Sequence, residues 1–174
     1  MLTMLCVVGM PGCGKSIFLD AARNFDYTII SMGDAVREET KKRGFPPQDH
    51  GKVAQSLRDE RGLAAVAHLV LNSLTPECII DGVRGLAEIE VFAQHYSLEI
   101  VAIHASPKIR FIRVKRRRRP GDPLCWKDFL ARDLRELGFG IGGVIALADH
   151  MLLNQSTKAQ FEKKCHEFFL QRRR

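Results

Sequence analysis

The segment Gly9–Ser16 reads GMPGCGKS and fills every fixed position of the phosphate-loop pattern G-x-x-x-x-G-K-[ST]. The apolar run Leu2–Val8 precedes it, and Ser16–Arg23 follows with apolar residues gathered on one face of a helical pattern. A strand, a glycine-rich turn and a helix in this order form the context in which the pattern marks a phosphate-binding site. The segment therefore predicts a P-loop fold that binds a nucleoside triphosphate.

The residue types of this loop suit phosphate binding. Glycines let the backbone curl so that its N–H groups face phosphate oxygens, and the start of the helix adds partial positive charge. We expect Lys15 to reach the β- and γ-phosphates as a catalytic residue, and the hydroxyl of Ser16 to bind Mg²⁺. With ATP taken as the nucleotide, the loop residues expected to bind it are Gly9, Met10, Pro11, Gly12, Cys13, Gly14, Lys15 and Ser16.

Composition points to one ordinary globular domain. The chain has 174 residues, 45% of them hydrophobic and 27% charged, which suffices for a core in a single domain spanning 1–174. No apolar run approaches the ~20 residues that cross a bilayer, and the N-terminal run lacks the basic start and cleavage site of a signal peptide. Five scattered cysteines without a C-x-x-C pair favour a reducing compartment. We therefore expect a cytoplasmic monomer or homodimer that makes no use of a membrane.

Short apolar runs recur along the chain and alternate with helical patterns. This alternation predicts an α/β fold with a parallel sheet and helices on both faces, and ligands bind beyond the carboxyl ends of such strands. Two connections are longer than a plain loop: a helical insertion at 34–76 and a basic loop at 115–123. The expected strands are Leu2–Val8, Tyr27–Ser31, Cys78–Asp81, Leu98–His104 and His150–Leu153.

The second expected strand runs into Ser31-Met32-Gly33-Asp34-Ala35-Val36-Arg37. This stretch resembles the segment I-S-T-G-D-x-x-R of adenylate kinases, and the resemblance implies that Arg37 binds the phosphate of the acceptor. Asp34 belongs to the same acceptor site, and we expect its carboxylate to cap the following helix. The alternative for Arg37 is a solvated helix face that it shares with Glu38 and Glu39.

The third expected strand ends in Asp81-Gly82-Val83-Arg84. An aspartate at the end of an apolar strand is expected to hold Mg²⁺, although capping of the next helix is the alternative. The segment resembles D-G-x-P-R of adenylate kinases, which implies that Arg84 is a catalytic clamp on the acceptor phosphate. This chain is one residue shorter and lacks the proline. It also has Glu88 where those enzymes carry a glutamine that reads the acceptor adenine, so Glu88 is an acceptor-binding candidate and the acceptor itself stays open.

The basic loop at 115–123 contains Arg116–Arg119 and is followed by a helix with Arg132. Its position resembles that of the lid in nucleoside monophosphate kinases. In such lids arginines close over the transferring phosphoryl group, neutralise it and exclude water. We expect Arg119 and Arg132 to be the catalytic arginines, and the alternative is a solvated basic run.

The last expected strand lies in the pattern A-D-x-x-x-x-N, which resembles dephospho-coenzyme A kinases and implies that Asn154 lines the adenine site. Together, G-M-P-G-C-G-K-S, M-G-D-x-V-R, I-D-G-V-R, H-A-S-P-K-x-R and R-D-x-x-E-x-x-x-G-I-G-x-V-I-A-x-A-D resemble a family of small, mostly archaeal proteins related to adenylate kinases. The resemblance implies a three-layer α/β/α sheet in the order 2-3-1-4-5. It also implies transfer of the γ-phosphoryl group of Mg²⁺-bound ATP to a small phosphorylated or nucleotide-like acceptor.

The net charge of +7 allows a second function class. Surplus arginine fits a kinase site that gathers two phosphorylated substrates, but it also fits a polyanionic partner. The alternative is therefore a nucleotide-dependent regulatory or nucleic-acid-associated ATPase, with Arg116–Arg119 on the polyanion. An aromatic content of 7%, mostly phenylalanine at core-like positions, leaves few rings for base stacking and speaks against this alternative.

Overall fold

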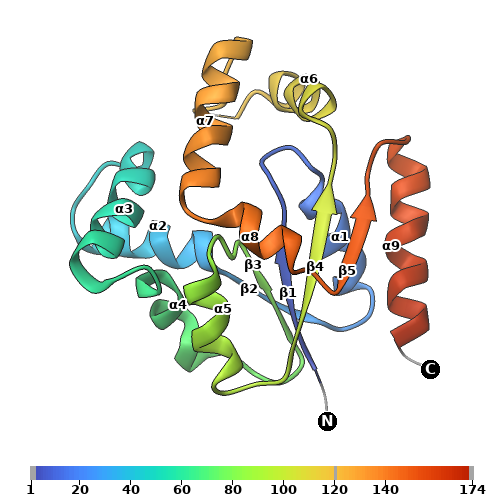
Figure 1. Cartoon of the computed structure of the whole chain (residues 1–174), viewed down its shortest axis with the longest axis horizontal. Coiled ribbons are helices and arrows are strands. Elements are labelled where there is room, and N and C mark those ends of the chain that lie inside the picture. Colours follow the sequence, from blue (N-terminus) through green and yellow to red (C-terminus); the bar gives the residue numbers. More distant parts are fainter. Residues whose placement is uncertain (1–2, 120, 173–174) are drawn as a thin grey trace.

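A five-stranded parallel sheet forms the centre of the computed structural model, which describes residues 3–119 and 121–172. The strand order is β2-β3-β1-β4-β5, which confirms the predicted fold class and order (Figure 1). Leu2 of the first predicted strand lies outside the described residues, and Tyr27 precedes the second strand. The strands are β1 (Met4–Val8), β2 (Thr28–Ser31), β3 (Cys78–Asp81), β4 (Leu98–His104) and β5 (His150–Leu153).

Helices cover both faces of the sheet, as the alternating pattern predicted. Every residue of β1 is buried, because a central strand of a parallel sheet meets a helical layer on each side. Leu5 and Val7 pack with rings such as Phe18 on one face, while Met4 and Cys6 join the core of the other face. The first layer holds α1 (Lys15–Arg23) and α9 (Lys158–Arg172), and the second holds α2 (Met32–Lys42), α4 (Ala65–Val70), α5 (Leu86–Ala93) and α8 (Ile141–Ala146).

The insertion between β2 and β3 is helical, as expected. It contains α2, the turn Pro47–Asp49, α3 (His50–Arg61), α4 and the turn Leu71–Ser73. The cap of α2 differs from the prediction: the hydroxyl of Ser31 accepts a hydrogen bond from the N–H of Asp34 at 3.1 Å. Ser31 is therefore the N-cap and Asp34 lies in the first turn, because a side chain caps the N–H groups two or three residues after its own.

The predicted lid lies between α6 (Pro107–Arg117) and α7 (Trp126–Gly138). Pro107 opens α6 at the first helical position, where its fixed φ and missing N–H are no disadvantage. Residue 120 of the predicted lid 115–123 lies outside the described part of the chain. In Figure 1, α7 rises away from the sheet and is joined to it through α8. None of the helices in the described ranges has the length and apolar character needed to cross a membrane.

Candidate active site

The phosphate loop connects β1 to α1 and takes a backbone form that depends on glycine. Gly12 and Gly14 have φ angles of +83° and +103°, a left-handed region that other residues rarely adopt. A Cβ atom on Gly14 would also lie 2.2 Å from the amide nitrogen of Asn154. Lys15, the first residue of α1, folds back so that its Nζ donates to the carbonyl of Gly9 at 3.0 Å. The loop is thus held in a curled form, in which the N–H of Cys13 donates to the carbonyl of Met10 at 3.0 Å, and a loop of this kind is suited to receive phosphate.

Asp81 stands beside this loop because β3 pairs with β1. Asp81 is in register with Val7 at the carboxyl end of both strands, and its Oδ1 lies 4.0 Å from Lys15 Nζ. This oxygen is buried and has no hydrogen-bond partner among the described residues, a costly state for a carboxylate. The carboxylate of Asp81 and the hydroxyl of Ser16 line the same cavity, and both are hard oxygen donors. Mg²⁺ prefers such donors, so these residues fit the expected metal.

A cavity of about 550 Å³ opens at this end of the sheet. It extends from the phosphate loop across the start of α2 to the loop after β3, with α6 and α7 on its other side. Of the residues expected in the site, those on its wall are Gly9, Met10, Pro11, Gly12, Cys13, Gly14, Lys15, Ser16, Arg37, Asp81, Arg84, Arg119 and Arg132. Asp34, Glu88 and Asn154 are not among its lining residues.

Two arginines mark the part of the cavity that faces the helical insertion. Arg37 lies in α2 and receives support from Asp34, whose Oδ1 is 3.1 Å from the Nε of Arg37. Arg84 follows β3, and its Nε lies 3.1 Å from Oε2 of Glu136 on α7. Both residues line the cavity, and they come from different elements.

Glu88 corrects the sequence-based expectation that it contacts the acceptor. Its side chain is buried, with Oε1 2.9 Å from Nη2 of Arg58 and Oε2 accepting from the backbone N–H of Arg84 at 2.7 Å. Both carboxylate oxygens are therefore engaged beneath the cavity wall. Arg58 itself reaches the cavity and lies over the ring of Phe139, 4.9 Å from its centroid. The position where adenylate kinases read a base thus supports two arginines in this chain.

Asn154 also has a role other than the expected one. The side chain is buried; its Nδ2 donates to the carbonyl of Cys13 at 2.8 Å, and its Oδ1 accepts from Nη2 of Arg113 at 3.0 Å. It therefore fixes the phosphate loop from behind. Arg113, which the sequence reasoning missed, lines the cavity, and burial lowers the pKa of its guanidinium. The spacing of four residues between Arg113 and Arg117 on α6 was the signal that could have found both on one helix face.

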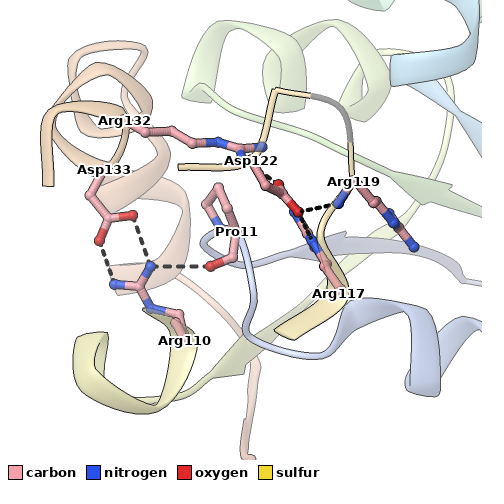
Figure 2. A network of polar contacts seen from close by, with 7 residues as sticks. All are labelled: Pro11, Arg110, Arg117, Arg119, Asp122, Arg132 and Asp133. Carbon is pink, nitrogen blue, oxygen red and sulfur yellow. Dashed lines mark hydrogen bonds and ion pairs between the residues drawn. The ribbon is translucent and has the colours of Figure 1, made fainter. Parts of the chain in front are cut away.

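In the lid, the carboxylate of Asp122 binds several arginines (Figure 2). Asp122 accepts from Nε and Nη2 of Arg117 at 2.7 and 2.8 Å, and from Nη1 of Arg132 at 3.0 Å. It also accepts from the backbone N–H of Arg119 at 3.1 Å. Arg117, Arg119 and Arg132 all border the cavity, so the lid presents three cations toward it.

The pH range over which this lid cluster persists gives a first prediction. Hydrogen bonding to Arg117 lowers the pKa of Asp122 to about 2. A carboxyl group whose pKa is lowered by folding contributes stability above its unfolded pKa of about 4 and loses it as the pH falls toward 2. We expect the difference in Tm between the wild-type protein and Asp122→Asn to be constant from pH 8 to 5 and to shrink below pH 4. A difference that varied between pH 8 and 5 would contradict the assignment.

Arg110 and Asp133 tie the lid helices to the phosphate loop. The guanidinium of buried Arg110 on α6 donates to both carboxylate oxygens of Asp133 on α7, at 2.8 and 2.6 Å. Its Nη1 also donates to the carbonyl of Pro11 at 3.2 Å (Figure 2). This pair is buried and bidentate, and it joins α7 to α6 and the loop at the position of Asp133.

Comparisons with known proteins agree with this architecture. A family model described as an AAA domain matches residues 8–125. A UPF0200 protein of Hyperthermus butylicus is 45% identical over 165 residues, covering 91% of this chain and 89% of the relative. Another from Thermococcus gammatolerans is 46% identical over 172 residues, covering 92% and 90%.

Several solved structures with the same fold are small-molecule kinases by name. The shikimate kinase of Acinetobacter baumannii in complex with shikimate gives a TM-score of 0.62 at 14% identity, covering 99% of this chain and 95% of the other. A gluconokinase from Sinorhizobium meliloti gives 0.54 at 15% identity, with coverages of 98% and 93%. At such low identity the likeness shows a common P-loop kinase-like fold.

Proposed function

The chain belongs to the UPF0200 family of archaeal P-loop proteins, and we propose that it is a kinase that transfers the γ-phosphoryl group of ATP to a small phosphorylated or nucleotide-like acceptor. One observation carries this proposal. A single cavity is bordered by the phosphate loop with Lys15 and, from other elements, by Arg37 and Arg84. A site for ATP hydrolysis alone has no need of a second set of anion-binding arginines beside the γ-phosphate position.

The proposed ATP end of the cavity is the phosphate loop with Lys15. Ser16 and Asp81 would hold Mg²⁺, which when bound would supply charge neutralisation for the phosphates of ATP. The cations of Arg117 and Arg132 border the same space from the lid, where they would stabilise charge on the transferring phosphoryl group. Positioning and charge neutralisation supply most of the catalysis in phosphoryl transfer, so a phosphate acceptor requires no general base.

The proposed acceptor end combines arginines with apolar side chains. Arg37 and Arg84 would hold an anionic group of the acceptor, while Met32, Val36 and Val66 line the neighbouring wall. This mixture suits a small molecule with an anionic group and a less polar body. The fold-level neighbours named shikimate kinase and gluconokinase support a small acceptor by analogy.

An acceptor panel tests the proposal. ADP formation from ATP and Mg²⁺ would be measured with AMP, CMP, UMP, GMP, dephospho-coenzyme A and no acceptor. We expect one acceptor to raise the rate at least about tenfold, because the correct acceptor completes the site. Arg84→Ala should remove most of that stimulation and leave the rate without acceptor nearly unchanged. Equal, slow ADP release in every reaction would contradict the kinase proposal.

The same result would favour the alternative, a nucleotide-dependent regulatory or nucleic-acid-associated ATPase. One observation keeps this alternative: Arg116 and Arg118 do not line the active-site cavity. They border a separate surface depression together with Lys115, Phe111 and Ile112. Phe111 also contacts Trp126, with ring centroids 5.4 Å apart, so a basic surface with an aromatic side chain is present on α6.

A further inference from the structure

Ion pairs on successive turns of α7 connect this helix to three separate parts of the site. Arg132 pairs with Asp122 of the lid, Asp133 pairs with Arg110 beside the phosphate loop, and Glu136 pairs with Arg84. Figure 1 shows α7 standing away from the sheet, and besides these pairs it is attached by buried Phe129, whose ring packs against Phe111 of α6. A change at one pair can therefore alter how α7 is held at the others.

The pair between Glu136 and Arg84 is unusual in its location. Glu136 is buried, and it borders the same cavity as Arg84. The described lining residues include two carboxylates: Asp81 faces Lys15 at the metal position, and Glu136 lies on the arginine that would clamp the acceptor. A carboxylate that is paired with Arg84 competes with an anionic acceptor for the same guanidinium group.

The competition follows from the negative charges of the Glu136 carboxylate and of a bound phosphate. The Nε of Arg84 is directed to Oε2 of Glu136, and the pair is held in place by Glu88 beneath and by the ring of Phe139, whose centroid lies 5.9 Å from the guanidinium carbon of Arg84. A phosphate that binds this guanidinium brings one to two negative charges next to the carboxylate. Like charges at one cation repel, so a phosphate bound to Arg84 would weaken the attraction between Arg84 and Glu136.

Building on the proposed kinase function, we propose that Glu136 couples the acceptor site to the lid helix. With the acceptor absent, Glu136 occupies Arg84 and holds the C-terminal half of α7 against the loop after β3. An anionic acceptor group displaces the carboxylate and releases this end of α7. Because Arg132 lies one turn earlier on the same helix, the release changes how the lid cation meets the γ-phosphoryl group. Glu136 acts through Arg84 and α7, and is a positioning residue.

The fluorescence emission of Trp126 can report this coupling directly. It is the single tryptophan of the chain and the first residue of α7. Its ring meets Phe111 of α6 edge-on at 5.4 Å and stacks on Phe129 at 5.4 Å, so its emission depends on how α7 sits against α6. The measurement requires binding only and no turnover.

The experiment titrates inorganic phosphate, as the acceptor anion, into protein saturated with Mg²⁺ and a non-hydrolysable ATP analogue. The analogue fills the phosphate loop, so added phosphate reports on the acceptor arginines. The wild-type protein should give a saturable change in Trp126 emission. In Glu136→Gln the half-saturating phosphate concentration should fall about fivefold, the equivalent of one partly exposed charge pair, and the emission change should be largely lost. Because the emission change is expected to be lost in Glu136→Gln, phosphate binding to this variant would be measured by calorimetry.

Two further variants complete the design. Glu90→Gln makes the same chemical change at an exposed glutamate of α5 and should behave like the wild type. Arg84→Ala should abolish the phosphate response, and thermal unfolding would verify that each variant is folded. A merely structural role of Glu136 would weaken phosphate binding, whereas the coupling predicts tighter binding.

Three results would overturn the inference. Unchanged or weaker phosphate binding in Glu136→Gln contradicts the displacement of the carboxylate. A wild-type emission change that persists in Glu136→Gln contradicts the coupling to α7. A wild-type protein that binds the ATP analogue but gives no phosphate response contradicts the inference alone. Failure to bind the analogue at all would contradict the proposed function, and this inference with it.

Discussion

Replacement of Lys15 by methionine is expected to lower phosphoryl transfer roughly 10²- to 10⁴-fold, which corresponds to a loss of about 3–5 kcal/mol of transition-state stabilisation. The side chain is half-buried between Gly9 and Asp81, and its ammonium group is aimed across the phosphate loop. Methionine keeps much of the length and apolar contact of lysine and removes its charge, so the fold should persist. The measurement is steady-state ADP formation with the acceptor identified by the panel.

The matched control is Lys158→Met, at the exposed start of α9 and away from the cavity. It makes the same chemical change and should leave turnover within about twofold of the wild type, since exposed surface substitutions rarely matter. Wild-type turnover in Lys15→Met would contradict the assignment of the phosphate loop as the catalytic centre. Loss of turnover in both variants would point to a general effect of charge.

Local patterns predicted the parts of the site that lie at strand ends. The phosphate loop, Asp81 and Arg84 follow directly from runs of adjacent residues, and a parallel sheet brings the carboxyl ends of its strands together. Arg119 and Arg132 also line the cavity, although Arg116 and Arg118 of the same basic run do not. Arg117 was left undecided among the lid arginines and Arg113 was missed, because choosing among neighbouring arginines requires the direction of α6.

The failed expectations concern side chains whose partners are distant in sequence. Asn154 binds the carbonyl of Cys13, 141 residues earlier, and Glu88 pairs with Arg58, 30 residues earlier. No local spacing announces such partners. The cap of α2 was a different kind of miss, because Ser31 and Asp34 are three residues apart, the spacing of a serine cap and an acidic residue in the first turn. That signal was present and was assigned to the wrong member of the pair.

Replacement of Glu88 by alanine is expected to destabilise the protein by about 3–5 kcal/mol, because removal of one partner leaves the other charge buried without compensation. The side chains of Arg58 and Glu88 are only 5% and 1% exposed, and their atoms meet at 2.9 Å. The same change leaves the N–H of Arg84 without its acceptor. For a domain of this size each kcal/mol lowers Tm by about 2–4 °C, so a fall of roughly 6–20 °C in thermal unfolding should be seen.

A double variant separates a structural role of Glu88 from contact with the acceptor. In Arg58→Met with Glu88→Gln the buried charges are gone together and glutamine can still accept from the N–H of Arg84, so most of the lost Tm should return. Glu90→Gln on the same helix should change stability by less than about 0.5 kcal/mol. If Glu88 instead read the acceptor, Glu88→Ala would raise the acceptor KM and leave Tm unchanged. One carboxylate oxygen of Glu88 binds the guanidinium of Arg58, and the other binds the backbone N–H of Arg84. We therefore expect Glu88→Ala to lower Tm, and to change acceptor binding only through its effect on these two arginines.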